Sequence, residues 1–284
     1  MPEQNGGVGR ASEVGPGMAP GPESPPAAGS AAESGVGSGS ESGSESGGES
    51  GSESQRHCDP AAGAPAQPFG SSLAPAEAGR PPQPVLEGLW AFGPNRDCQG
   101  GTAWWLEHRE GCLLVDCPAY TAANLAFLHE RPPGRLVLTS REGHGRARRF
   151  QEALGLPVLV QEQEAYLLPN VKRLQTFAGE LVLSAGLRLL WTPGPTPGAC
   201  VVHAGGATDV LFCGRLLSPT APGAAAPLRT ARSFHWGRWQ RSLQALKTWL
   251  PEGSPRWIAS GAGLGALGGA KLIGPGRPVL EGLE

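Results

Sequence analysis

Residues 136–150, with the sequence LVLTSREGHGRARRF, constrain the fold more than any other stretch of this chain. The apolar run at the start predicts a buried strand that ends at Thr139. A polar turn that contains glycine follows over residues 140–145. An arginine-rich segment then begins a helix, with Phe150 on its apolar side. A strand that leads through a short turn into a helix predicts a domain of the α/β class.

Large aromatic side chains concentrate after residue 84. All eight Trp and six of the seven Phe lie in residues 85–284, whereas residues 1–84 consist mainly of Gly, Ser, Pro, Ala and Glu. A segment with so little apolar surface cannot offset the entropy that it would lose on folding. We therefore predict a disordered acidic tail over residues 1–84 and one folded domain over residues 85–284. An SGSE-type repeat over residues 38–53 favours a flexible, solvating tail, with a tail regulated by phosphorylation as the alternative.

Net charge and cysteine usage narrow the class of protein. The tail has a net charge of −7 and the predicted domain one of +5, which is too mild for a nucleic-acid-binding domain. No uncharged apolar run is long enough to cross a membrane, and the first residues resemble no secretory signal. None of the cysteines has C-x-x-C spacing, and Cys112, Cys117, Cys200 and Cys213 lie in apolar runs. These features predict buried free thiols in a cytoplasmic protein.

The predicted domain alternates between apolar strands and amphipathic helices. The helix over residues 236–250 has the clearest signal, because apolar residues recur there at steps of three and four. A Gly-Gly pair at 205–206 predicts a hairpin between two strands. A Pro/Ala-rich stretch over residues 219–227 predicts a loop. Further predicted helices span 121–130, 146–154 and 161–169, and predicted strands span 86–92, 101–106, 112–115, 136–139, 158–160, 181–183, 187–191, 200–203, 210–213 and 257–259.

Five short motifs follow one another along the domain. They are LLVDC at 113–117, LVLTSREGHG at 136–145, WTPGPTPG at 191–198, VLFCGRLL at 210–217 and WIASGAG at 257–263. Their order resembles lliDtG, THxHxDH, TPGHTPG, lFtGDll and PGHG of the metallo-β-lactamase superfamily, over residues 86–270. The resemblance implies a four-layer αββα sandwich. QEQEAYLLP at 161–169 and the stretch 234–236 are similar to a cyanobacterial-type branch whose metal motif is degenerate.

The resemblance implies a metal cleft, but this chain departs from the family at most metal-binding positions. Ser140 and Glu142 stand where the family has the first two histidines of its motif. His144 and Gly145 stand where it has Asp and the last histidine. Zinc is held by neutral imidazoles and anionic oxygens around an open coordination position. Of these four residues, Glu142 and His144 alone could still bind a metal.

The remaining metal positions are also replaced. Pro195 stands for the histidine of TPGHTPG, Ala262 for that of PGHG, and Arg215 for the Asp that bridges the metals. A cation about 4 Å from a divalent ion would repel it by roughly 8 kcal/mol at an effective dielectric of about 20. We predict that Arg215 occupies the place of the metal and pairs with Glu142 or Asp116. The alternative is a guanidinium that points to solvent.

Two further features have a structural explanation beside a functional one. Asp116 matches the Asp that supports the metal loop in the family, and it could also cap the helix over residues 121–130. Residues 263–268, GLGALG, match the G-x-G-x-x-G of dinucleotide-binding proteins. Because too few residues follow for a βαβ unit and its acidic partner, we interpret this match as a glycine-rich turn.

Other polar side chains could take part in a ligand site. His144, His203 and His235 could form a rewired metal site with Glu142 or Cys200, but their spacing favours ordinary polar roles. A cysteine nucleophile at 200 or 213 would need an exposed thiolate, which a strand position disfavours. Arginines crowd the start of the helix over 146–154 and could hold a phosphate or carboxylate, with a solvated basic face as the alternative. They are Arg141, Arg146, Arg148 and Arg149.

These observations predict a metallo-β-lactamase-like domain that has lost most metal ligands, holds no cofactor and is non-catalytic. Its former cleft would bind a small anionic ligand or a protein partner, and neither nucleic acid nor membrane. The alternative is a hydrolase of thioester, ester or phosphoester bonds with a rearranged zinc site that contains Glu142 and His144. A third possibility is a structural domain that displays its tail. Cleft candidates are Asp116, Ser140, Glu142, His144, Pro195, Arg215 and Ala262, and anion-binding candidates are Arg141, Arg146 and Arg149.

Overall fold

The structure is a computed structural model, and it describes residues 78–283. The predicted tail over residues 1–84 therefore lies outside the described residues, apart from 78–84. The first strand, β1 (Gln83–Leu86), begins ahead of the predicted domain boundary at residue 85. It pairs antiparallel with β2 (Leu89–Ala91) across a turn at Gly88, whose φ is 71°. The single strand predicted over 86–92 is thus wrong, because the glycine turn divides it.

The first sheet runs in chain order from β1 to β7. β1 to β4 pair antiparallel, and β4 to β7 pair parallel. Residues of β4 and β6 are buried on both faces, as is usual for strands of a parallel sheet that is covered on both sides. The further strands are β3 (Trp104–Leu106), β4 (Cys112–Val115), β5 (Gly134–Leu138), β6 (Val158–Gln161) and β7 (Leu174–Phe177).

The second sheet has the order β14-β11-β10-β9-β8. β11 and β14 are parallel, and the other neighbours are antiparallel. A separate hairpin forms where the sequence predicted a loop over 219–227, with Gly223 at a φ of 71° in its turn. The strands are β8 (Glu180–Ser184), β9 (Leu187–Trp191), β10 (Cys200–Ala204), β11 (Val210–Gly214), β12 (Ser218–Ala221), β13 (Ala224–Ala226) and β14 (Trp257–Ser260).

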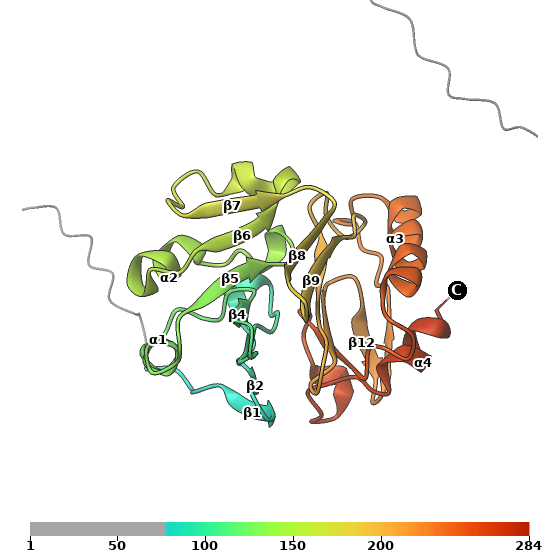
Figure 1. Cartoon of the computed structure of the whole chain (residues 1–284), viewed down its shortest axis with the longest axis horizontal. Coiled ribbons are helices and arrows are strands. Elements are labelled where there is room, and N and C mark those ends of the chain that lie inside the picture. The colour runs from blue at the N-terminus through green and yellow to red at the C-terminus, as the bar shows by residue number, and fades with distance from the viewer. Residues whose placement is uncertain (1–77, 284) are drawn as a thin grey trace, which may run out of the picture. The chain divides into compact units, whose positions relative to one another are not determined.

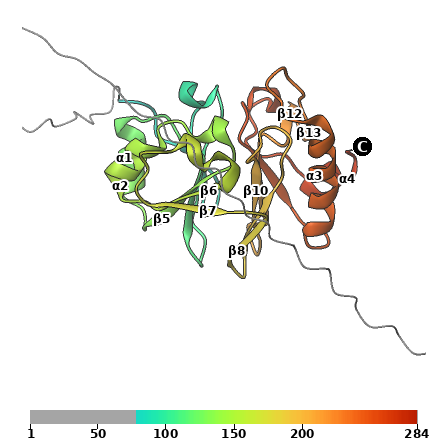
Figure 2. The ribbon, with the colours of Figure 1, turned by 90° about the horizontal axis from the view of Figure 1, so that it is seen from above.

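Helices cover the outer faces of both sheets. Figures 1 and 2 show α1 and α2 against the first sheet and α3 and α4 against the second. The layers therefore follow the order αββα, which confirms the predicted architecture. The helices are α1 (Ala122–His129), α2 (Ala147–Leu154), α3 (Trp236–Trp249) and α4 (Gly276–Glu281), and the short 3-10 turns are η1 (Arg96–Cys98), η2 (Arg141–Gly143), η3 (Glu162–Leu167) and η4 (Gly265–Leu267).

The main core lies between the two sheets. Val137 of β5 faces this core, whereas Leu136 and Leu138 of the same strand face the helices. This alternation is the two-residue period of a strand that is buried on both sides. Trp104 packs edge-to-face on Phe212, with 6.3 Å between ring centroids. The stretch 136–150 thus joins the core between the sheets to the helical layer. It also places the turn over residues 140–145, which we call the motif turn, at the carboxyl end of β5.

Candidate functional site

Asp116 anchors the turn that follows β5. It directly follows β4 in a left-handed conformation with a φ of 61°, and it is 5% exposed. Its Oδ1 accepts a hydrogen bond from the Thr139 backbone N–H at 2.8 Å, and its Oδ2 accepts one from the Thr139 hydroxyl at 2.7 Å. Burial raises the pKa of Asp116 to about 6. The helix-cap interpretation is wrong, because Thr121 caps α1 by accepting from the Asn124 N–H.

The motif turn packs tightly on its surroundings. Gly143 lies so close to Asp116 that a Cβ on it would overlap the carboxylate. Gly145 is left-handed, with a φ of 43°, and a Cβ there would lie 2.8 Å from the Cβ of Cys117. No side chain fits at Gly145 without a change in the backbone. The structure therefore leaves no room for the histidine that the family carries at this position.

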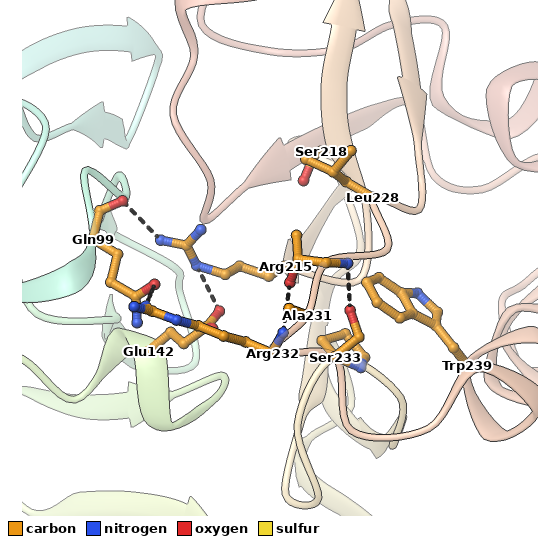
Figure 3. A pocket seen from close by; sticks show the side chains of 11 residues that line it. Gln99, Glu142, Arg215, Ser218, Leu228, Ala231, Arg232, Ser233 and Trp239 are labelled. Atoms are coloured by element: carbon orange, nitrogen blue, oxygen red, sulfur yellow. Dashed lines mark hydrogen bonds and ion pairs between the residues drawn. The ribbon is translucent and has the colours of Figure 1, made fainter.

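Arg215 follows β11 and reaches across to the loops of the first sheet. Its Nε donates to Glu142 Oε2 at 2.9 Å, which is one of the two pairings predicted from the sequence. Its Nη2 donates to the carbonyl oxygen of Cys98 at 2.7 Å and, as Figure 3 shows, to that of Gln99 at 3.3 Å. The side chains of Arg215 and Glu142 are 22% and 14% exposed. One guanidinium thus ties together the loop before β3, the motif turn and the end of β11.

A cavity of about 340 Å³ opens beside this ion pair. The guanidinium groups of Arg215 and Arg232 lie on the side of Gln99 (Figure 3). Arg232 donates from Nη1 to Gln99 Oε1 at 2.8 Å. Leu228 and Trp239 lie on the opposite side, and Leu228 is 60% exposed. The other lining residues are Glu142, Pro195, Ser218, Thr230, Ala231 and Ser233.

The predicted cleft candidates divide into two groups. Glu142, Pro195 and Arg215 line the cavity. The others are buried and do not line it; they are Asp116, Ser140, His144 and Ala262. Two important lining residues, Arg232 and Leu228, escaped prediction because they lie outside every motif.

A buried pair connects the motif turn with η3. His144 Nε2 lies 3.8 Å from Glu164 Oε2, and the two side chains are 10% and 1% exposed. Glu164 Oε1 accepts a hydrogen bond from the Gly198 N–H at 3.0 Å. Burial lowers the pKa of His144 to about 4 and raises that of Glu164. Glu164 was missed from the sequence, where an acidic residue in a short helix predicts a solvent-facing position.

The arginines at the start of α2 do not line the cavity. Arg146 Nε lies 2.7 Å from Asp97 Oδ2, and Arg148 forms an ion pair within α2. Arg149 lies over an aromatic ring at 5.7 Å from its centroid. Arg141 is exposed at the start of the motif turn. Three of the four arginines that the sequence suggested for anion binding therefore already have partners within the protein.

The other two candidate histidines have partners of their own. His203 Nε2 lies 2.9 Å from Asp209 Oδ1. His235 caps α3, where its Nδ1 accepts from the Arg238 N–H at 3.2 Å. Across residues 78–283, no group of three or more His, Cys, Asp or Glu side chains has the arrangement of a metal site. The structure does not bring the three histidines together as a rewired site would require.

The cysteines of the described domain are free and buried, as predicted for four of them. Cys58 lies outside the described residues. Burial raises the pKa of Cys213 to about 12 and that of Cys200 well above its ordinary value. A thiolate nucleophile at either position is therefore disfavoured. The described cysteines are Cys98, Cys112, Cys117, Cys200 and Cys213.

The side chains at the family's metal positions do not fit a zinc pair. Glu142 is held by Arg215, and His144 faces Glu164. Gly145 has no space for a ligand side chain. Zinc sites need several converging nitrogen, sulfur or oxygen donors. Here the two surviving donors have other partners, and a cation stands beside one of them.

The architecture matches solved structures of low sequence identity. A metallo-β-lactamase from Hirschia baltica is similar, with a TM-score of 0.52, 15% identity and coverage of 71% of this chain and 95% of that one. VMB-1 gives a TM-score of 0.53 and 12% identity, over 68% and 95% of the two chains. TMB-1 gives a TM-score of 0.52 and 13% identity, over 72% of this chain and 97% of that one. The chain has the metallo-β-lactamase fold.

Sequence comparisons add nothing to this structural match. No protein-family model matches the chain, and no curated protein matches it. The cyanobacterial-type branch therefore remains a prediction from the motifs. Among the described residues of this metallo-β-lactamase fold, no helix is long and apolar enough to cross a membrane.

Replacing Arg215 with Ala should destabilise the domain by about 1 to 3 kcal/mol, because Glu142 would keep a poorly solvated charge without a partner. The hydrogen bonds to the 98–99 carbonyls would be lost as well. Urea unfolding measures this effect. Arg148→Ala is the matched control, since it removes an exposed pair within α2 that contributes about 0.5 kcal/mol or less. Equal effects of the two substitutions would contradict a structural role for Arg215.

Proposed function

We propose that this protein is a non-catalytic relative of the metallo-β-lactamase-fold hydrolases and that it binds a small anionic ligand in its former cleft. The ion pair between Arg215 and Glu142, with 2.9 Å between Nε and Oε2, carries the proposal. A fixed guanidinium where the family has a metal-bridging carboxylate supports anion binding and opposes metal binding. The buried free thiols support a reducing compartment, and we propose the cytoplasm.

The exchange of a metal for a guanidinium changes what the cleft can do. A zinc ion both attracts anionic groups and lowers the pKa of its bound water. A guanidinium retains the first property through directed N–H donors, but it is a very weak acid and offers no coordination position to water. The cleft would therefore still attract anionic groups, as a zinc site does, but it would not generate hydroxide from bound water.

The other groups near the cavity do not replace the lost water activation. His144 has a pKa of about 4 because it is buried, so its imidazole is neutral at neutral pH and could accept a proton. It faces Glu164 rather than the cavity, however, and does not line it. The described cysteines are buried thiols. Among the residues that line this cavity, the carboxylate of Glu142 is paired with Arg215, and no histidine or cysteine is present to activate a water molecule or one of the hydroxyl groups.

Zinc content is the direct test of this proposal. We expect purified protein, loaded with excess zinc and then dialysed, to retain far less than one ion per chain when measured by mass spectrometry. The Glu142→Ala and His144→Ala variants should give the same low value. Near-stoichiometric zinc that disappears in both variants would overturn the proposal and favour the hydrolase of thioester, ester or phosphoester bonds.

A further inference from the structure

The two arginines of the cavity have N–H groups that make no hydrogen bond within the described residues. Arg215 uses Nε for Glu142 and Nη2 for backbone carbonyls, and within residues 78–283 its Nη1 has no hydrogen-bond partner. Arg232 uses Nη1 for Gln99, and its other two nitrogens likewise have no partner in the described part of the chain. Guanidinium groups bind carboxylates through parallel N–H donors of this kind. Two partly used groups on one wall therefore form a receptor for an anionic head.

The charge at this wall favours a single negative charge on the ligand. Two arginines and one glutamate line the cavity, and their formal charges leave a net of one positive charge. Glu142 lies against Arg215, so a second negative charge on the ligand would be held close to this carboxylate. A monocarboxylate satisfies the free donors without that repulsion. A phosphate dianion would also reach the free donors, but its second negative charge would be repelled by Glu142.

The opposite wall carries apolar side chains together with the hydroxyl groups of Ser218 and Ser233. Leu228 is 60% exposed and lines the cavity across from the guanidinium groups, on the same side as Trp239 (Figure 3). Pro195 adds a further apolar surface. A cavity of about 340 Å³ lies near the lower end of the range of about 300 to 1,000 Å³ for small-molecule sites. A cationic wall across from a wall with an exposed leucine suits a short molecule that has one anionic end and an apolar tail.

We infer that the ligand is an amphipathic monocarboxylate, a small organic acid whose carboxylate bridges Arg215 and Arg232 and whose apolar tail covers Leu228. This inference rests on the proposed binding function and specifies its ligand class. The cavity volume favours a small acid over a macromolecule. The carboxyl terminus of a peptide offers the same head group and is distinguished in the test.

Calorimetric titration of the full chain with hexanoate, acetate, hexanol and hexyl phosphate tests the inference. Each buried methylene adds about fourfold to affinity, so hexanoate should bind at least about tenfold more tightly than acetate. Hexanol and hexyl phosphate should bind more weakly than hexanoate. N-acetylleucine, which mimics a peptide carboxyl terminus, should also bind more weakly, because desolvating its amide group costs free energy that the alkyl chain of hexanoate does not. Tighter binding of N-acetylleucine or hexyl phosphate than of hexanoate would overturn the inference.

Matched variants assign the two walls. Leu228→Ser should reduce the ratio of hexanoate to acetate affinity without changing acetate binding. Val182→Ser is its control, because Val182 is 59% exposed and lies outside the cavity. Arg232→Ala should weaken hexanoate binding by about tenfold or more, and Arg148→Ala should not. An unchanged ratio in Leu228→Ser would overturn the inference.

The two proposals fail in different ways. If acetate or hexyl phosphate binds in a manner that Arg232→Ala weakens but hexanoate gains nothing over acetate, the amphipathic ligand is wrong and the anion-binding role stands. If none of the probes binds, the inferred ligand class is overturned. Stoichiometric zinc overturns the proposed function itself.

Discussion

Gly143→Ala should be among the most destabilising single substitutions in this domain, with an expected loss of about 3 to 5 kcal/mol. A Cβ on this residue would overlap the carboxylate of Asp116, which is buried and fixed by two hydrogen bonds to Thr139. The carboxylate cannot move aside without losing these bonds. The backbone of the motif turn cannot move either, since the Gly143 carbonyl accepts from the Cys117 N–H at 3.0 Å.

Gly265→Ala is the matched control for this substitution. Both glycines lie in short 3-10 turns, and neither has a left-handed φ. A Cβ at Gly265 would have no neighbour within 4 Å, so Ala should change stability there by about 0.5 kcal/mol or less. Urea unfolding of both variants gives the comparison. A loss below about 1 kcal/mol in Gly143→Ala would show that the turn adapts and that Asp116 is not fixed.

How much of the fold could be predicted depended on the strength of each local pattern. α3 was predictable because Trp239, Leu243 and Leu246 recur at helical spacing and are all buried. β7 and α4 were missed because each contains few apolar residues. In α4 the sequence also begins with glycine, arginine and proline, which is a weak pattern for a helix. The β12–β13 hairpin consists of small residues and proline, which predict a loop. Its pairing is visible only in three dimensions.

The candidate site was predictable where a motif fixed the position of a residue. The motif order placed Arg215 beside the degenerate metal turn, and the structure pairs it with Glu142. Glu164 and Arg232 could not be found in this way, since tertiary packing brings each of them to its place from a segment without a motif. Gly145 stands where the family has the last histidine of its motif. Its left-handed backbone and the nearness of Cys117 leave no room there for a side chain, which the sequence alone does not reveal.

Asp116 should make the domain less stable as the pH rises from about 4 to about 7. Burial raises its pKa from 3.8 to about 6 in the folded state. Between these two values the folded state holds more protons than the unfolded state, so stability falls with increasing pH. The difference in pKa corresponds to a loss of about 3 kcal/mol, which is complete above the folded-state pKa. Below about pH 4 the carboxyl group is protonated in both states and this loss is absent.

The wild-type profile alone would not isolate this effect, because His144 acts in the opposite direction. Its pKa falls from 6.5 to about 4 on burial, so its contribution to stability increases with pH over nearly the same interval. Asp116→Asn removes the titrating group and keeps a polar side chain of the same shape beside Thr139. The stability of this variant minus that of wild type should therefore increase by about 3 kcal/mol between about pH 4 and about pH 7. Urea unfolding across this range measures the difference, and a flat profile would mean that Asp116 keeps an ordinary pKa in the folded domain.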